Sequence, residues 1–181
     1  NTAHELGHKK SKLERGLATL VLSMGAYGHF AIEHNRGHHR HVATPEDCAS
    51  SRMGETLYAF ALRELPGAFI CAWRLESGRL QRHDKSPWSF ENEILRAGAI
   101  TVAVSVGLIV AFGPIMVPYL LVSYFAGAFH LTMANYIEHY GLLRRKLPTG
   151  RYERCRPEHS WNSNHICSNW ALFHLQRHSD H

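Results

Sequence analysis

The chain has 181 residues, 15 of them histidines, and a formal charge of +5 with histidine counted as neutral. Its length is typical of one domain, and no basic patch interleaved with aromatic residues accompanies the charge, which argues against a nucleic-acid partner. The four cysteines form no CxxC pair, which argues against a rubredoxin-like iron site, a zinc ribbon or a disulfide framework.

The first histidine motif contains His4 and His8, four residues apart around Glu5. On a helix this spacing places both imidazoles on one face, where they can share a metal ion. The same five residues, HELGH, also match the zinc-metalloprotease signature, in which Glu5 would be the general base. This motif alone leaves both interpretations open.

An uncharged, largely apolar stretch follows from Gly16 to Ile32. It is at the lower limit of the length that crosses a bilayer, and it contains His29 and three glycines. We therefore predict a buried or membrane-surface helix that links two histidine motifs, in preference to a membrane crossing.

The second motif contains His34, His38 and His39, preceded by Glu33. His34 and His38 repeat the i, i+4 spacing, and His39 lies about 100° further around a helix. With the first motif this makes five candidate ligands, whereas a catalytic zinc takes three protein ligands and keeps one position open. The pattern therefore predicts two metal ions or one larger site.

The middle of the chain contains two apolar regions. Residues 58–73 are interrupted by charged residues and a proline, which favours an interfacial or cap helix, and residues 74–93 read as a polar connection. From Ala97 to Ile137 there is no Asp, Glu, Lys or Arg, over about twice the ~20 residues of one crossing. Because Gly113–Pro114 marks a turn, we predict a transmembrane hairpin over about 94–134.

Basic residues flank this hairpin on both sides and are absent from its turn. Loops rich in Lys and Arg stay on the cytoplasmic side, so both flanks are expected to meet on that face of the membrane. The flanking basic residues are Arg79, Arg82, Lys85 and Arg96 before the hairpin, and Arg144, Arg145, Lys146, Arg151, Arg154 and Arg156 after it.

Two further motifs complete the histidine pattern. His139 lies in NYIEHYGL, where the second apolar helix returns to the cytoplasmic side, and His178 and His181 lie three residues apart at the end of the chain. Eight histidines in four clusters are thus expected on one face. Imidazole suits iron, copper and zinc, so the ligand type alone does not choose the metal.

Three carboxylates sit beside these histidines: Glu33, Glu138 and Asp180. Each either accepts a hydrogen bond from a ligand imidazole and fixes its tautomer or is simply solvated. The chain starts at Asn1 within a few residues of the first motif and stops inside the last one, so we expect residues 1–181 to be a single domain truncated at both ends.

Together, HELGHK, EHNRGHH, NYIEHYGL and LQRHSDH resemble the motifs of the membrane-bound alkane monooxygenases, relatives of the membrane fatty-acid desaturases and other hydrocarbon hydroxylases. The histidine boxes are shared by that whole superfamily, and NYIEHYGL is the more discriminating segment. The resemblance covers essentially the whole chain. It implies an all-α integral membrane bundle whose cytoplasmic helical cap holds a histidine-rich diiron site.

The resemblance also implies that nine histidines hold two non-haem iron ions. The last box of the family ends in two adjacent histidines, and this chain stops after the first, so we expect the ninth ligand and the N-terminal membrane helices to lie outside this sequence. The eight matching residues are His4, His8, His34, His38, His39, His139, His178 and His181.

The activity implied by the resemblance is terminal hydroxylation of medium- to long-chain n-alkanes to primary alcohols, with O2 and with electrons from rubredoxin and its reductase. The expected location is the bacterial inner membrane, crossed several times, with the histidine boxes on the cytoplasmic side. A fatty-acid desaturase or a different hydrocarbon hydroxylase of the same superfamily is the alternative. The basic loops at 79–85 and 144–156 are suited to attract an acidic electron carrier.

Overall fold

The computed structural model describes residues 6–8, 11–163 and 165–166. In these ranges the chain is helical, with one isolated antiparallel bridge between Lys146 and Tyr152 and no strand, which confirms the predicted all-α class. The elements are α2 (Lys12–Met24), α3 (Phe30–Glu33), the π-helical turn η1 (His34–His38), α4 (His39–His41), α5 (Leu57–Gln81), α6 (Glu93–Phe112), α7 (Met116–His139) and the 3₁₀ turn η2 (Pro157–His159).

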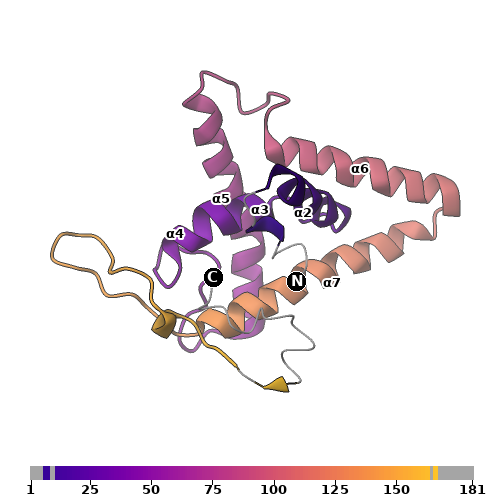
Figure 1. Ribbon diagram of the computed structural model, residues 1–181. Helices are drawn as coiled ribbons and strands as arrows, with labels where there is room; N and C mark the ends of the chain where they lie inside the picture. The colour runs from indigo at the N-terminus through magenta and orange to yellow at the C-terminus, as the bar shows by residue number, and fades with distance from the viewer. Residues whose placement is uncertain (1–5, 9–10, 164, 167–181) are drawn as a thin grey trace.

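Helices α6 and α7 form a helical hairpin: they meet at the turn between them and diverge away from it (Figure 1). Asn92 caps α6 by accepting hydrogen bonds from the amides of Ile94 and Leu95, and Gly113 turns the chain with φ +84°. Both helices are long and apolar enough to cross a membrane, and only 11% of each apolar window is buried inside the structure. Since a core helix of a soluble protein is mostly buried, these exposed apolar surfaces fit lipid.

The second hairpin helix is longer than the predicted boundary near residue 134. It continues to His139, and its polar residues Asn135 and Glu138 are buried against other elements. The NYIEH segment is therefore the last part of α7, and the helix itself carries His139 to the site.

The prediction of one linking helix over 16–32 is wrong. Helix α2 ends at Met24, Ala26 adopts a positive φ of 54°, and α3 starts at Phe30. The break lets the backbone at Gly28 pass close to α6, where an added Cβ would lie 2.5 Å from the Cβ of Ala97. A larger residue at this position would push α6 away from the histidine-bearing turn.

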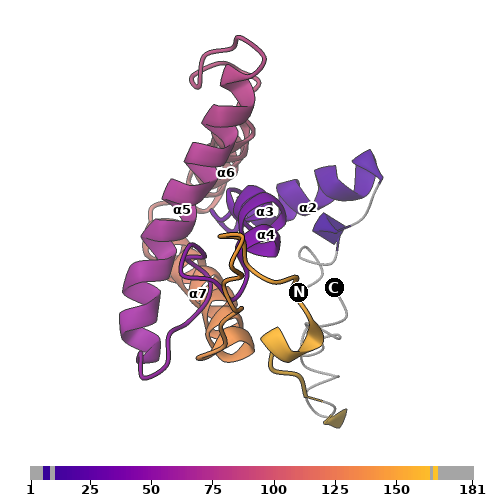
Figure 2. The same cartoon turned by 90° about the vertical axis from the view of Figure 1, so that its left-hand side faces the viewer.

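Helix α5 runs across the open end of the hairpin (Figures 1 and 2). It starts after Thr56, whose hydroxyl accepts from the amide of Ala59, and it continues through Pro66 to Gln81. The expected cap helix over 58–73 is thus confirmed but extends further, and residues 74–81 are helical where a connection was predicted.

The buried carboxylate of Glu76 fastens α5 to η1 and to α6. The Glu76 side chain is 0% exposed and accepts hydrogen bonds from Arg36 of η1 at 3.0 Å, from Arg79 at 2.7 and 2.8 Å, and from the backbone amide of Glu93 at 2.8 Å. Arg36 also binds the Glu93 carboxylate at 3.0 Å. Because Arg36 lies between the histidines of the second motif, this network ties the histidine-bearing turn to the first turn of α6.

Candidate metal centre

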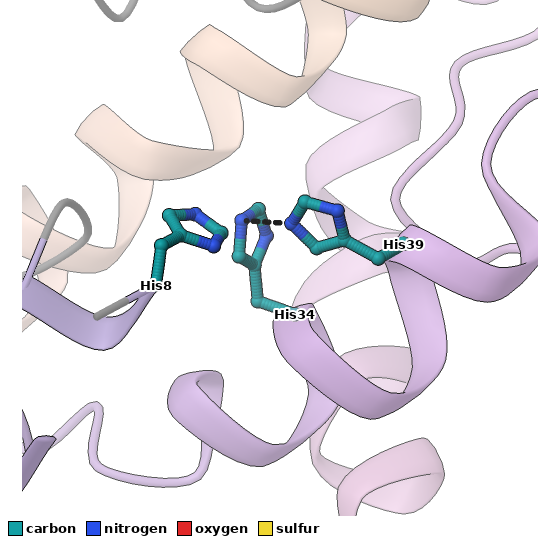
Figure 3. Close-up of side chains that lie close together, drawn as sticks. All are labelled: His8, His34 and His39. Atoms are coloured by element: carbon teal, nitrogen blue, oxygen red, sulfur yellow. Dashed lines mark hydrogen bonds between the residues drawn. The ribbon is translucent and has the colours of Figure 1, made fainter. Parts of the chain in front are cut away.

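The second histidine motif forms a π-helical turn, η1, instead of the regular α-helix assumed from the sequence. In a π-helix the repeat is about one residue longer, so residues five apart meet. The Nε2 atoms of His34 and His39 accordingly lie 3.2 Å apart (Figure 3). The His34 and His38 rings still stack, with centroids 5.2 Å apart, but His39 is the closer partner of His34. π-Bulges in helices are frequent at functional sites.

His8 of the first motif joins this pair. Its ring centroid lies 5.2 Å from that of His34 and 4.9 Å from that of His39. One ring nitrogen of each of the three residues lies within 4.8 Å of the others, a spacing that one metal ion can bridge (Figure 3). We call His8, His34 and His39 the first histidine group; it joins two motifs that are 26 residues apart at their nearest members.

His38 and His139 form a second histidine group. Their ring centroids lie 4.8 Å apart, and the two residues are 1% and 0% exposed. Each ring faces an acceptor with its Nδ1 atom: Asp47 Oδ2 at 2.9 Å from His38, and the backbone carbonyl of His159 at 3.2 Å from His139. An Nδ1–H that donates to such an acceptor leaves the Nε2 lone pair as the metal-binding atom.

Asp47 itself is held rigidly. One carboxylate oxygen also accepts from the Ser50 hydroxyl at 2.5 Å, and the other accepts from the amide of Ala49 at 3.1 Å. Burial disfavours the charged form of His38, but the adjacent Asp47 carboxylate outweighs burial and raises the pKa of His38 to about 9. In the neutral ring that binds a metal, the same carboxylate holds the remaining proton on Nδ1, so Asp47 orients a candidate ligand and sets its tautomer.

Sequence reasoning missed Asp47 and the His159 carbonyl. The carboxylates it proposed as acceptors are Glu33, Glu138 and Asp180, each beside a histidine in the sequence. Asp47 lies nine residues after its partner in a polar loop, with no helical spacing to connect the two. A backbone carbonyl leaves no trace in the sequence.

Of the three predicted carboxylates, Glu33 and Glu138 are within the described residues, and both are buried. Glu33 is buried and accepts from the Cys48 thiol at 3.6 Å, and burial raises the pKa of Glu33 to about 8. Glu138 is buried beside His139. Their roles toward the ligands stay predictions. His4, His178, His181 and Asp180 lie outside the described residues.

The 44–55 loop that carries Asp47 also holds the end of α7. The Tyr136 hydroxyl donates to the carbonyl of Glu55 at 2.7 Å, and the amide of Gly54 donates to the Tyr140 hydroxyl at 3.0 Å. Ser51 donates to the Tyr136 carbonyl at 2.7 Å. These two tyrosines, which flank His139 in the NYIEHYGL motif, thus dock α7 onto the loop that orients His38.

The whole chain, residues 1–181, matches the fatty acid desaturase family. The chain belongs to this family. As a member it is 60% identical, over all of its length, to alkane 1-monooxygenase 1 of Alcanivorax borkumensis and to the alkane 1-monooxygenase of Ectopseudomonas oleovorans. It is 28% identical over 78% of its length to the xylene/toluene monooxygenase hydroxylase component of Pseudomonas putida.

The chain spans less than half the length of these three relatives: it covers 45% of each of the two alkane 1-monooxygenases and 38% of the xylene/toluene protein. The resemblance predicted from the four motifs is confirmed at the level of the family. The zinc-metalloprotease interpretation of the first motif has no support in this family match.

Proposed function

We propose that the protein containing this chain hydroxylates the terminal methyl group of medium- to long-chain n-alkanes to give primary alcohols. The observation that supports this is the 60% identity, over all 181 residues, to proteins named alkane 1-monooxygenase. Identity to the xylene/toluene monooxygenase component is 28% over a smaller part of the chain, so a linear alkane is the better-supported substrate. The reaction consumes O2, two electrons and two protons, and it yields the alcohol and water.

The side chains of the two histidine groups fit a pair of non-haem iron ions. They supply only imidazole nitrogens, which suit iron, and two of the rings have their Nδ1 atoms fixed by hydrogen-bond acceptors. We assign His8, His34 and His39 to one ion, and His38 and His139 to the other. His4, His178 and His181 would complete the set. When bound, the two irons would supply the reduction of O2 and the oxidation of the C–H bond.

The residues of this chain would prepare that chemistry in three ways. The Asp47 carboxylate keeps the Nδ1 proton on His38, so that its Nε2 atom is available to a metal. Burial of His38 and His139 keeps water from this half of the site, which limits side reactions. The lipid-facing surfaces of α6 and α7 place the site beside the phase into which an alkane partitions.

Residues 1–181 contain no flavin, haem or iron–sulfur motif, so the electrons must reach this part of the protein from elsewhere. We propose rubredoxin as the donor and the cytoplasmic face of the bacterial inner membrane as its docking side. The basic 144–156 segment supports this choice: it projects as a hairpin from the body of the protein (Figure 1) and is closed by the Lys146–Tyr152 bridge. Arg151 and Arg154 on it are exposed.

Reversing these two charges with Arg151→Glu and Arg154→Glu is expected to raise the KM for rubredoxin by about 10-fold and to weaken its dependence on salt, because steering by opposite charges is screened by ions. Steady-state rates at several ionic strengths measure this. Arg15→Glu with Arg74→Glu, two exposed residues on α2 and α5, is the control of equal charge change. Equal effects of both pairs would refute docking at this hairpin.

The function itself is tested with a chimera in which residues 1–181 replace the matching segment of the E. oleovorans alkane 1-monooxygenase. Cells that express it with rubredoxin and its reductase are given octane or an acyl lipid. We expect 1-octanol from octane. Unsaturated or hydroxylated acyl chains in place of 1-octanol would favour the alternative superfamily activities, and no product from a well-expressed, iron-loaded chimera would contradict the proposal.

A further inference from the structure

Another buried carboxylate, Glu64, lies on α5, close enough to Asp47 and His38 for their charges to affect it. It is 0% exposed, and burial raises its pKa. Its two oxygens accept from α7: Oε2 from the Thr132 hydroxyl at 2.7 Å, and Oε1 from the Asn135 side-chain amide at 3.3 Å. A buried carboxyl group is costly unless it is hydrogen-bonded, so these two contacts set a specific geometry between α5 and α7.

The two donors to Glu64 lie on α7 close to His139. Thr132 and Asn135 are three residues apart and share one face of the helix, and Asn135 is four residues, or about one turn, before His139. A carboxylate that holds both donors fixes the rotation of α7 and its position along its axis. His139 is the next residue on that face, and its ring reaches His38 with centroids 4.8 Å apart.

Other contacts between these two helices are aromatic or apolar, such as that of Phe60 with Tyr136, whose ring centroids lie 5.6 Å apart. Leu65 of α5 and Ala128 and Leu131 of α7 pack against the same small apolar cluster. Apolar contacts are non-directional and tolerate sliding or rotation by part of a turn, whereas hydrogen bonds to two donors do not. Glu64 thus supplies the directional contacts between α5 and α7, in addition to those that Tyr136 and Tyr140 make with the 44–55 loop.

We propose that Glu64 is a positioning residue: through Thr132 and Asn135 it sets the place of His139 opposite His38 and thereby shapes the second half of the metal centre. The proposal rests on the proposed diiron function. It predicts that loss of the Glu64 acceptor affects metal binding and chemistry, and leaves the binding of the alkane unchanged.

The test uses the full-length chimera with Glu64→Leu, Glu64→Gln and, as a control for lost packing, Leu80→Ala, which removes a fully buried side chain on the same helix about four turns away. For Glu64→Leu we expect kcat to fall about 10-fold or more at an unchanged KM for octane. We also expect a reduced iron content and a change in one part of the Mössbauer spectrum. Glu64→Gln keeps an acceptor oxygen for the hydroxyl of Thr132, so it should retain kcat within about three-fold.

A purely structural role would give a different pattern. If Glu64→Leu and Leu80→Ala lose iron and activity in proportion to their lower thermal stability, or if Glu64→Leu keeps the parent spectrum and kcat, the positioning role is refuted. Iron content and spectra are measured without turnover. A parent chimera that binds iron but forms no alkanol would therefore contradict the proposed function, while the comparison of Glu64 variants would still decide the positioning role.

Discussion

Replacing His39 with alanine in the full-length chimera is expected to lower 1-octanol formation by at least about 100-fold and to reduce bound iron. Removing residues that only support a metal ligand typically costs 10- to 100-fold in affinity or activity, and loss of a ligand itself should cost more. His39 is the residue whose Nε2 atom lies 3.2 Å from that of His34, so it belongs to the first histidine group. Product formation from octane and iron content per protein are the two measurements.

His41→Ala is the matched control for this experiment. His41 lies on the same short helix, α4, two residues further on, and pairs with the exposed carboxylate of Glu46 at 3.1 Å. It should keep product formation within about two-fold of the parent. An iron content and an activity of His39→Ala equal to those of His41→Ala would mean that the π-helical turn does not present His39 to a metal.

The large apolar features of this fold could be predicted because the cause is local in the sequence. A long run of uncharged, apolar residues is stable only in lipid or in a protein core. The Gly113–Pro114 pair marks the position of the turn in this run. The two apolar helices and the turn between them were therefore predicted correctly, whereas the membrane crossing and the side on which the basic flanks meet stay predictions. The end of α7 was placed too early, near residue 134, whereas the helix runs on through Asn135 and Glu138 to His139. They are buried, and burial of a polar side chain depends on partners distant in the sequence.

The histidine pattern shows the limit of helical spacing as evidence. The i, i+4 rule pairs His34 with His38, but one additional residue in the turn brings His34 to His39 and leaves His38 facing His139. Spacing alone does not reveal a π-helical turn. Contacts from elsewhere in the fold surround this turn: Gly37 lies against the Cys71 thiol, where an added Cβ would lie 3.2 Å from the sulfur, and Arg36 is held by Glu76.

The pairing of His38 with His139 in the second histidine group could not have been predicted from the sequence. His38 and His139 are about 100 residues apart, and they meet because Glu64, Tyr136 and Tyr140 fasten α7 to α5 and to the 44–55 loop. These contacts involve residue types that usually lie on surfaces. The motif analysis identified the ligand candidates by chemistry, whereas the buried polar contacts that orient them became visible only in the fold.

Asp47 leads to the second large prediction. Asp47→Leu in the full-length chimera is expected to weaken iron binding by about 10- to 100-fold, the usual cost of removing an acceptor behind a ligand histidine. Without the carboxylate, the buried Nδ1–H of His38 loses its 2.9 Å partner, and the ring can rotate or adopt the other tautomer. A competition titration against an iron chelator measures the affinity, and 1-octanol formation follows the activity.

Two further variants separate orientation from charge. Asp47→Asn keeps an oxygen that can accept from His38 Nδ1 but removes the negative charge, so an orienting role predicts a loss of about 10-fold or less, well short of the leucine variant. Glu46→Gln removes the neighbouring charge from a side chain that is 61% exposed, and it should bind iron like the parent. If Asp47→Asn is as damaging as Asp47→Leu, the negative charge of Asp47 matters more to the second histidine group than the hydrogen bond that orients His38. If both bind iron normally, the hydrogen bond between Asp47 and His38 has no part in holding the metal.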